Sequence, residues 1–185
     1  MQRFRPGDRL FILPKFASLY PQTSGIVRAV AADPFRAAFN AYTLEFTNGS
    51  AANAFEFQVI EEPPNYTTRI ADIVFDSRTH MAQTRARGRS NNPKIVLHND
   101  RFDIDMTIKS GNSGSPDILG QVLENGTGGF VAPLEIRLLR DAILVARTVS
   151  DGCGVFEFTN VPAGFLNILV GIPQHLLQIL GTFSI

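Results

Sequence analysis

The 185-residue sequence has a single cysteine, no excess of either charge and no long apolar run. One thiol, Cys153, excludes an intrachain disulfide framework and zinc sites built on several thiolates. Seventeen basic residues balance seventeen acidic ones, so no global field draws the chain to nucleic acid or to an anionic membrane. The opening residues, MQRFRPGDRL, lack the apolar region of a signal peptide, and no run of eighteen apolar residues occurs. Together these absences predict a cytoplasmic protein with no membrane association.

The rest of the composition is typical of a globular protein built from strands. Hydrophobic residues make up 44% of the chain and charged residues 18%, which is enough apolar material for a core. Helical periodicity is nearly absent, whereas fifteen Phe and many Val and Ile occur in short runs separated by Gly, Pro, Asn and Asp. We therefore predict an all-β fold in three parts. These are a small barrel over 1–62, an Arg-rich connector with short strands over 63–110, and a C-terminal domain over 111–185.

The first sixty residues carry the strand and turn signals of a small barrel. The segment DRLFILPKF follows a Pro6-Gly7-Asp8 turn, and TSGIVRAVAAD contains Gly25, which permits the bend needed to close a barrel. The segments AYTLEF and AFEFQVI flank Asn48-Gly49, and Asn-Gly is a strong hairpin signal. Strict alternation predicts that the following residues share one core: Tyr42, Leu44, Phe46, Phe55, Phe57 and Val59. The same alternation points Glu45, Glu56 and Gln58 outward.

The pattern PGDRLFI…SGIVRAV…YTLEFTNG…FEFQV resembles the SH3-like barrels of the KOW and Tudor type. Relatives of that kind bind RNA, DNA, methylated lysine or other proteins, so the resemblance implies a binding module without choosing its ligand. Tyr20, Phe39 and Tyr42 could form an aromatic pocket for a cation or a base. The alternative is that these three rings are core and rim packing.

The C-terminal part contains a turn followed by a corner, in SDGCGVFEFTNVPAGFLNILV. Asp151 can cap its own tight turn, Gly154 supplies a permissive backbone angle, and Phe156 and Phe158 project to one face. Burial of these two rings and of Phe165 would contribute roughly 1.5–3 kcal/mol each. The residues that define the pattern are Asp151, Gly154, Phe156, Phe158, Val161, Pro162, Gly164 and Phe165. The pattern resembles the carboxypeptidase-regulatory-like, or transthyretin-like, Ig-like β-sandwich, whose members are non-catalytic accessory, adhesive or interaction domains.

The segment SGNSGSP, residues 110–116, resembles the loop that carries the nucleophile of trypsin-like serine endopeptidases, with Ser113 in the nucleophile position. Such an enzyme needs a histidine base on an earlier strand, followed by an orienting carboxylate. His80 and His98 lie only 33 and 15 residues before Ser113, which leaves no room for the strands that separate base from nucleophile. Gly, Asn, Ser and Pro are also ordinary linker residues. We therefore expect a domain junction here, and a serine hydrolase only as a distant alternative.

The middle of the chain is locally basic. Between Asp76 and Arg101 there are six basic side chains against two acidic ones. They could contact phosphate or an acidic protein face, or they could be a solvated loop between the strands ADIVFDS and KIVLHND. The candidate partner-binding residues are Arg78, Arg85, Arg87, Arg89 and Lys94.

The arrangement VFDSR…KIVLHNDRFDIDMTI ahead of the C-terminal pattern resembles a bacterial group of small sigma-factor-associated proteins. That resemblance implies a regulatory role through protein–protein interaction, with a transcription regulator or a multi-protein complex as partner. The sequence contains no spacing of metal ligands, and the segment DPFRAAFNA has no phosphate-binding glycines. We therefore expect no catalytic residue, metal or cofactor. We predict a non-enzymatic adaptor or regulatory protein, with nucleic-acid binding by the barrel and the basic arm as the alternative. The oligomeric state is left open.

Overall fold

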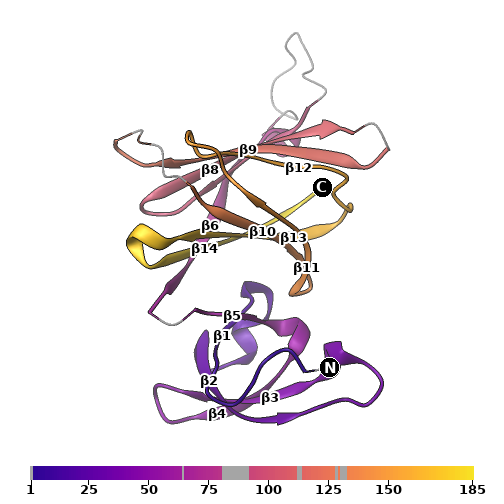
Figure 1. The fold of residues 1–185 in the computed structure, drawn as a ribbon, viewed down its shortest axis with the longest axis vertical. Helices are drawn as coiled ribbons and strands as arrows, with labels where there is room; N and C mark the ends of the chain where they lie inside the picture. The colour runs from indigo at the N-terminus through magenta and orange to yellow at the C-terminus, as the bar shows by residue number, and fades with distance from the viewer. Residues whose placement is uncertain (1, 64, 81–91, 112–113, 128, 130–132) are drawn as a thin grey trace. The chain divides into compact units, whose positions relative to one another are not determined.

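The computed structural model describes residues 2–63, 65–80, 92–111, 114–127, 129 and 133–185. They form almost only β-strands, which confirms the predicted all-β fold (Figure 1). The chain divides into two compact units, residues 1–68 with Asp141–Ile143 and residues 69–140 with Leu144–Ile185. Within the described ranges, no helix has the length and apolar character needed to cross a membrane.

Five antiparallel strands of the first unit form a nearly closed, barrel-like sheet in the order β4-β3-β2-β1-β5 (Figure 1). The strands are β1 (Arg9–Ile12), β2 (Ser24–Ala31), β3 (Ala41–Phe46), β4 (Ala51–Phe55) and β5 (Val59–Glu61). Three short 3-10 helices connect them: η1 (Pro14–Leu19), η2 (Ala37–Phe39) and η3 (Glu56–Gln58). The connections between strands are therefore short and partly ordered.

The β3–β4 hairpin turns at Asn48-Gly49 as predicted, with Gly49 at φ 78°, but its strands pair differently. Tyr42 lies opposite Ala54, and Leu44 lies opposite Ala52. The cross-strand neighbours of Tyr42 and Leu44 are thus small alanines, which leave room in the core for these two large side chains. Phe55 follows Ala54 directly and therefore points to the other face of the strand.

The alternation along AFEFQVI breaks at η3, because a single 3-10 turn has three residues per turn rather than the two of a strand. The predicted inward orientation of Phe55 and Phe57 is wrong: Phe55 is 41% exposed and Phe57 is half-buried. The predicted outward orientation of Gln58 is also wrong, since only 7% of it is exposed. Val59 begins β5 and is fully buried, as predicted.

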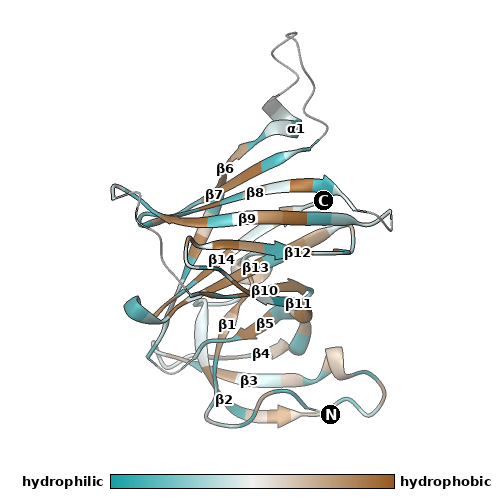
Figure 2. Ribbon diagram, turned by 45° about the horizontal axis from the view of Figure 1, so that its top comes forward, coloured by the Kyte–Doolittle hydropathy of each residue, from teal (hydrophilic) through white to brown (hydrophobic). Residues whose placement is uncertain are grey.

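Nine strands of the second unit form one sheet in the order β11-β10-β13-β14-β6-β7-β8-β9-β12. The strands are β6 (Thr67–Asp76), β7 (Lys94–His98), β8 (Phe102–Ser110), β9 (Pro116–Glu124), β10 (Glu135–Arg140), β11 (Ile143–Val149), β12 (Val155–Phe158), β13 (Phe165–Ile172) and β14 (Leu177–Ser184). One turn of α-helix, α1 (Ser77–His80), follows β6, and a 3-10 helix, η4 (Pro173–His175), joins β13 to β14. Buried residues alternate with more exposed ones along β8 and β9, and Figure 2 shows both hydrophobic and hydrophilic residues along these strands.

The nine-stranded sheet folds over on itself around one core. Both β14 and β7 neighbour β6, so in a flat sheet their backbones would lie roughly 10 Å apart, side by side. A Cβ atom on Gly181 of β14 would instead lie 2.5 Å from Cδ1 of Leu97 on β7, so the two strands face each other. Buried residues of both halves join one cluster, from Ile104 and Met106 on β8 to Ile168 on β13. The glycine is needed because any side chain there would displace Leu97.

Two predicted boundaries are wrong. The described residues of the predicted connector, 63, 65–80 and 92–110, include strands β6, β7 and β8 of the second sheet, so they are not a link outside it. The segment SGNSGSP joins β8 to β9, with Ser110 paired to Pro116, and is therefore a hairpin connection rather than a domain junction. Small polar residues suit both tight turns and linkers, so composition alone did not separate the two.

The turn at Asp151 forms as predicted. Its Oδ1 accepts hydrogen bonds from the backbone N–H groups of Cys153 at 2.8 Å and Val155 at 2.9 Å. Gly154 has φ 74°, and a Cβ atom there would lie 2.6 Å from the carbonyl oxygen of Val122. This position therefore requires glycine both for its backbone angle and for its close approach to β9.

The two rings after this turn pack in the core, but the third does not. Phe156 and Phe158 are 2% and 3% exposed and meet edge to face at 5.8 Å. A Cβ atom on Gly120 would lie 2.2 Å from Cζ of Phe156, so the ring covers the backbone of β9. Phe165, expected in the core, is 77% exposed at the start of β13.

Candidate functional site: an aromatic cluster on the first unit

Four phenylalanine rings pack against one another on the first unit, and we call Phe16, Phe39, Phe55 and Phe57 the aromatic cluster. Phe57 is its centre: it meets Phe16 edge to face at 5.6 Å and Phe39 at 5.8 Å, and it stacks on Phe55 at 5.7 Å with 7° between the planes. The ring centres of Phe39 and Phe55 lie 6.0 Å apart, which completes the cluster. These two rings are 43% and 41% exposed, so the cluster is partly open to solvent.

The connections between strands bring the four rings together. Phe16 lies in η1 after β1, Phe39 ends η2 before β3, and Phe55 ends β4. Phe57 lies in η3, where the break in strand alternation turns it outward. Residues from three separate connections therefore meet at one surface, which is typical of binding sites carried on a rigid sheet.

The partly buried carboxylate of Glu56 ties together two of the connections that carry the cluster. One oxygen of Glu56, Oε2, accepts hydrogen bonds from Asn40 Nδ2 at 2.8 Å and from the hydroxyl of Tyr42 at 2.6 Å. The backbone N–H of Glu56 also donates to the carbonyl of Asn40 at 2.9 Å. These bonds tie η2 to η3, and so tie Phe39 to its neighbours Phe55 and Phe57.

Tyr42 belongs to the core and not to a surface pocket. Its ring is fully buried and meets Phe4 edge to face at 5.3 Å. Its hydroxyl oxygen accepts from the backbone N–H groups of Arg3 and Phe4 while donating to Glu56. Burial raises the pKa of Tyr42, and the hydrogen bond to Glu56 raises it further. The predicted pocket of Tyr20, Phe39 and Tyr42 is thus wrong in its third member, because the Tyr42 ring points from β3 into the core.

Tyr20 lies beside the cluster without joining its ring contacts. Its hydroxyl donates to Gln58 Oε1 at 2.6 Å, and the same oxygen accepts from the backbone N–H of Phe55 at 2.8 Å. Burial raises the pKa of Tyr20. Of the predicted pocket, only Phe39 lies in the cluster, and sequence reasoning missed Phe16, Phe55 and Phe57. The spacing of Ala52 and Ala54 is a signal for Phe55. These two small residues fit the core opposite large side chains, and strand alternation then turns Phe55 to the other face.

Two cations of the first unit already cover ring faces in the cluster. The ammonium of Lys15 lies 4.8 Å from the centre of Phe16, and the guanidinium of Arg36 lies 5.9 Å from the centre of Phe39. The stacked pair Phe55 and Phe57 covers one face of each of those rings. The cluster therefore offers mainly ring edges, which suit packing against apolar side chains.

The loop before η2 presents a further ring. Phe35 is 92% exposed, the largest exposed fraction among the described large hydrophobic side chains. Oδ1 of Asp33 accepts from the backbone N–H groups of Phe35 at 2.8 Å and Arg36 at 2.7 Å, which orders the loop. These two hydrogen bonds lower the pKa of Asp33. Phe35 is therefore held out by a defined turn.

The predicted basic residues are only partly described. Arg85, Arg87 and Arg89 lie outside the described residues. Arg78 binds the carboxylate of Asp76 through Nε at 2.9 Å and Nη2 at 2.6 Å, and its Nη1 donates to the carbonyl of Ser184 at 2.7 Å. The pairing with Asp76 raises the pKa of Arg78. Arg78 thus joins β6 to β14. Lys94 is exposed at the start of β7.

The residues of the serine hydrolase alternative lie apart or outside the described ranges. Ser113 and the side chain of His80 are not described. His98 pairs with Asp103, with Nδ1 2.7 Å from Oδ1, at one end of β8. Ser110 lies at the other end of this strand, seven residues beyond Asp103 and thus roughly 23 Å away at about 3.3 Å per residue. Within the described ranges, no group of three or more His, Cys, Asp or Glu side chains could hold a metal ion.

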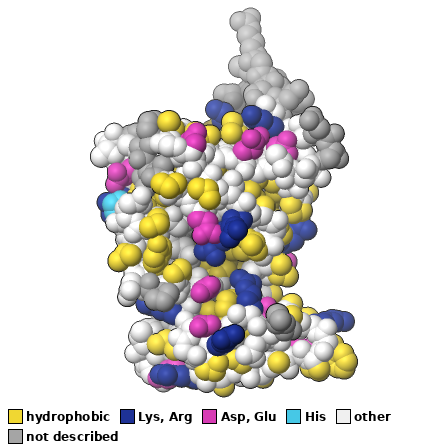
Figure 3. Space-filling view, viewed as in Figure 1, with side chains coloured by type: hydrophobic (Ala, Val, Ile, Leu, Met, Phe, Trp, Pro, Cys, Tyr) yellow, Lys and Arg dark blue, Asp and Glu magenta, His cyan; other side chains and the backbone are white. Residues whose placement is uncertain are grey.

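Comparison with known proteins gives no further guide, since no family model, curated protein or solved structure matches the chain. The surface charges agree with the neutral composition: Figure 3 shows acidic and basic side chains interspersed on the visible face.

Proposed function

We propose that the chain is a non-enzymatic adaptor or regulatory protein of a bacterial complex, and that it binds a protein partner through the aromatic cluster. The observation that carries this proposal is the cluster itself, in which two rings are more than 40% exposed. Exposed rings contribute little to folding, whereas aromatic side chains dominate the energy of protein interfaces. The hydrogen bonds of Glu56 hold these rings in one arrangement before any partner arrives.

The surface favours an apolar partner segment over a cationic ligand. A methylated lysine needs open ring faces around a cation. Here Lys15 and Arg36 of the chain already lie over Phe16 and Phe39, so they occupy ring faces that a cationic ligand would need. Aliphatic side chains can pack on the ring edges, and Phe35 can enter a pocket on the partner.

Nucleic-acid binding is the second candidate, and the basic segment around Arg85, Arg87 and Arg89 favours it. Single-stranded nucleic acid binds by stacking bases on open aromatic faces. Stacking of Phe55 on Phe57 and the cations over the other two rings leave few such faces. The zero net charge of the chain also weakens the field that draws a polyanion. We therefore rank a protein partner first.

Two features support the family resemblances that frame this proposal. The strand order of the first unit, with η3 between β4 and β5, is compatible with an SH3-like barrel of the KOW and Tudor type. The capped turn at Asp151 and the packed pair Phe156 and Phe158 are compatible with a transthyretin-like sandwich. Both kinds of domain occur as interaction modules, and the lone Cys153 suits the proposed cytoplasmic setting.

Recovery of bound molecules under two conditions tests the choice between partners. The native protein is purified with and without nuclease, and bound protein and nucleic acid are quantified at two salt concentrations. We expect a protein partner that survives nuclease and is lost in the Phe39→Ser/Phe55→Ser variant. The matched control is Phe165→Ser, which removes a 77% exposed ring from the second unit. Tight, salt-sensitive retention of nucleic acid by the unmodified protein would overturn the proposal.

A further inference from the structure

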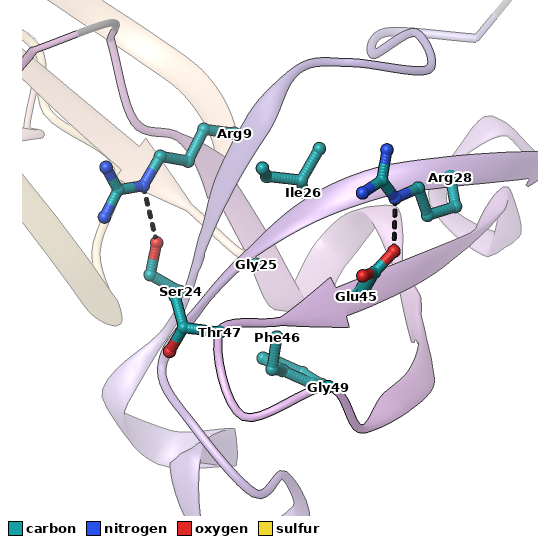
Figure 4. Close-up of a pocket in the computed structure, with 9 residues that line it drawn as sticks. All are labelled: Arg9, Ser24, Gly25, Ile26, Arg28, Glu45, Phe46, Thr47 and Gly49. Atoms are coloured by element: carbon teal, nitrogen blue, oxygen red, sulfur yellow. Dashed lines mark hydrogen bonds and ion pairs between the residues drawn. The ribbon is translucent and has the colours of Figure 1, made fainter.

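A second surface of the first unit is a shallow depression of about 310 Å³, lined by residues of β1, β2 and β3 and by the turn after β3 (Figure 4). It shares no residue with the aromatic cluster. Two arginines, Arg9 and Arg28, flank the exposed side chain of Ile26 (Figure 4). A depression with an apolar centre between two guanidinium groups suggests an anionic ligand, and the way each arginine is held supports this.

A buried carboxylate positions Arg9. Glu62 is 3% exposed, and its Oε2 lies 2.8 Å from Nε of Arg9. The hydroxyl of Ser24 donates to the same oxygen at 2.5 Å and accepts from Nε of Arg9 at 3.0 Å. The other oxygen of Glu62 accepts from the backbone N–H of Thr68 at 2.9 Å. Glu62 is therefore fixed by three partners, and it fixes the guanidinium in turn.

A β-bulge positions Arg28. The pairing of β2 with β3 shifts by one residue between Val27 and Ala29, and Arg28 is the extra residue. Bulges re-aim side chains, and here Nε of Arg28 pairs with the carboxylate of Glu45 on β3 (Figure 4). Both arginines are thus held by Nε alone.

The outer nitrogens of both guanidinium groups remain for a ligand. Nη1 and Nη2 of Arg9 and of Arg28 make no hydrogen bond to the described residues. Two adjacent N–H groups of a guanidinium match the two oxygens of a carboxylate. Each arginine can therefore bind one anionic group through its outer N–H groups without breaking its existing ion pair.

The spacing of the two arginines matches an extended peptide. Arg9 lies directly opposite Ile26, and Arg28 is two residues further along β2, so the two Cα atoms are roughly 7–8 Å apart. Side chains at positions i and i+2 of an extended chain project from one face roughly 6.6–7 Å apart. Two carboxylates separated by one residue would thus reach both guanidinium groups together.

We propose that this depression binds an extended acidic segment of a protein partner, with carboxylates at alternate positions on Arg9 and Arg28. The inference deepens the proposed function, on which its choice of a protein ligand rests. A phosphate chain is the lesser candidate, because Glu45 and Glu62 neutralise the two arginines and leave little net field for a polyanion. Each of the two carboxylates of the peptide needs only the local fork of N–H groups on one guanidinium.

A titration with two isomeric peptides tests this site directly. The probes are blocked pentapeptides with the same composition, one carrying two aspartates separated by a valine and the other carrying them adjacent. Arginine Nε–H and backbone signals of the isotope-labelled native protein are followed by NMR. We expect the alternating isomer to shift the signals of 24–28 and 45–49 and to bind about threefold more tightly than the adjacent isomer.

The variants Arg9→Lys and Arg28→Lys keep the positive charge that pairs with Glu62 and Glu45. They lose the forked N–H donors, so each should abolish the preference for the alternating peptide. Arg36→Lys, beside the aromatic cluster, should preserve it. Equal binding of the two isomers, no binding at millimolar peptide, or shifts of the same signals by lower concentrations of inorganic phosphate would each overturn the proposal. Loss of the natural partner in Phe39→Ser/Phe55→Ser reports on the aromatic cluster, so failure of one site is distinguishable from failure of the other.

Discussion

Two carboxylates of the first unit, the partly buried Glu56 and the buried Glu62, are held by hydrogen bonds. Glu56 accepts from Asn40 and Tyr42 next to the aromatic cluster in sequence, and Glu62 accepts from Ser24 and holds Arg9 at the depression. A buried carboxylate without its donors costs more than the bonds themselves contribute. These residues therefore stabilise the fold and orient a surface at the same time.

The hydroxyl of Tyr42 predicts a loss of stability at high pH. Because burial and Glu56 raise its pKa in the folded protein, the folded state holds this proton more tightly than the unfolded chain does. The stabilisation is fully present below the ordinary tyrosine pKa of about 10 and is lost as pH rises through the higher folded-state pKa. We expect the free energy of unfolding, measured in urea, to fall more steeply above pH 10 in the native protein than in Tyr42→Phe. The contribution of Tyr20 is the same in the native protein and in Tyr42→Phe, so it cancels in the comparison. Parallel pH profiles of the two proteins would contradict the prediction.

The turn at Asp151 predicts a large effect of one glycine and a small effect of its neighbour. Gly154→Val should lower the free energy of unfolding by more than about 1 kcal/mol, because a β-branched residue resists positive φ and its Cβ would meet the carbonyl of Val122. Gly152→Ala is the matched control, since a Cβ atom there has no neighbour within 4 Å. Denaturant unfolding of the two variants measures the difference, and equal stability would refute this reading of the turn.

At the scale of elements, the sequence predicts the turns that are formed by residues close together in the chain. The Asn48-Gly49 turn and the Asp151 turn lie where the sequence pattern places them, because each depends on residues within a few positions. The phase of Phe55 and Phe57 could not be predicted in this way. It depends on η3, whose outward rings are stabilised only by contact with Phe16 and Phe39 from distant segments.

The membership of strands in sheets shows the same limit. The sequence indicates the strands ADIVFDS and KIVLHND, but their pairing with β14 and β8 depends on contacts far along the chain. Likewise, SGNSGSP has a composition that suits a linker or a hairpin, and the pairing of β8 with β9 decides between them. Of the candidate site, Phe39 was predicted and its three partners were not, because the cluster exists only once three connections meet.

The corrected phase of the β3–β4 hairpin makes its own prediction. Ala54→Leu should lower the free energy of unfolding by roughly 1–3 kcal/mol, because this fully buried alanine faces Tyr42 and the core has no room for a larger side chain. Phe55→Leu alters the neighbouring, exposed position and should change stability far less. Urea denaturation of both variants checks the assignment. A larger loss of unfolding free energy in Phe55→Leu than in Ala54→Leu would favour the inward orientation of Phe55 that was inferred from the sequence alone.

At the scale of the whole molecule, a neutral chain carries a basic segment and an apolar surface. Opposite charges are interspersed on the visible face, so attraction of a partner depends on local groups (Figure 3). This favours recognition by shape and apolar packing over long-range steering.

The basic segment distinguishes the two proposed functions. Replacing Arg85, Arg87 and Arg89 by Gln should weaken binding to an acidic protein partner and leave retention on nucleic acid as low as before. If these arginines bind phosphates instead, duplex DNA binding should lose roughly 0.9 log units of salt dependence per lost contact. A gel-shift titration at two salt concentrations beside a pull-down of the triple variant measures both, and a flattened salt slope would favour the nucleic-acid reading.

The most direct measurement is the dissociation constant of the purified partner for the native protein and for Phe39→Ala/Phe55→Ala, determined by calorimetry. Rings at the centre of an interface typically contribute 2 kcal/mol or more, so the variant should bind at least about thirtyfold more weakly. Phe165→Ala, which removes an exposed ring from the second unit, should bind as the native protein does. An unchanged dissociation constant in the double variant, with its fold intact, would contradict the proposal that the aromatic cluster is the binding site.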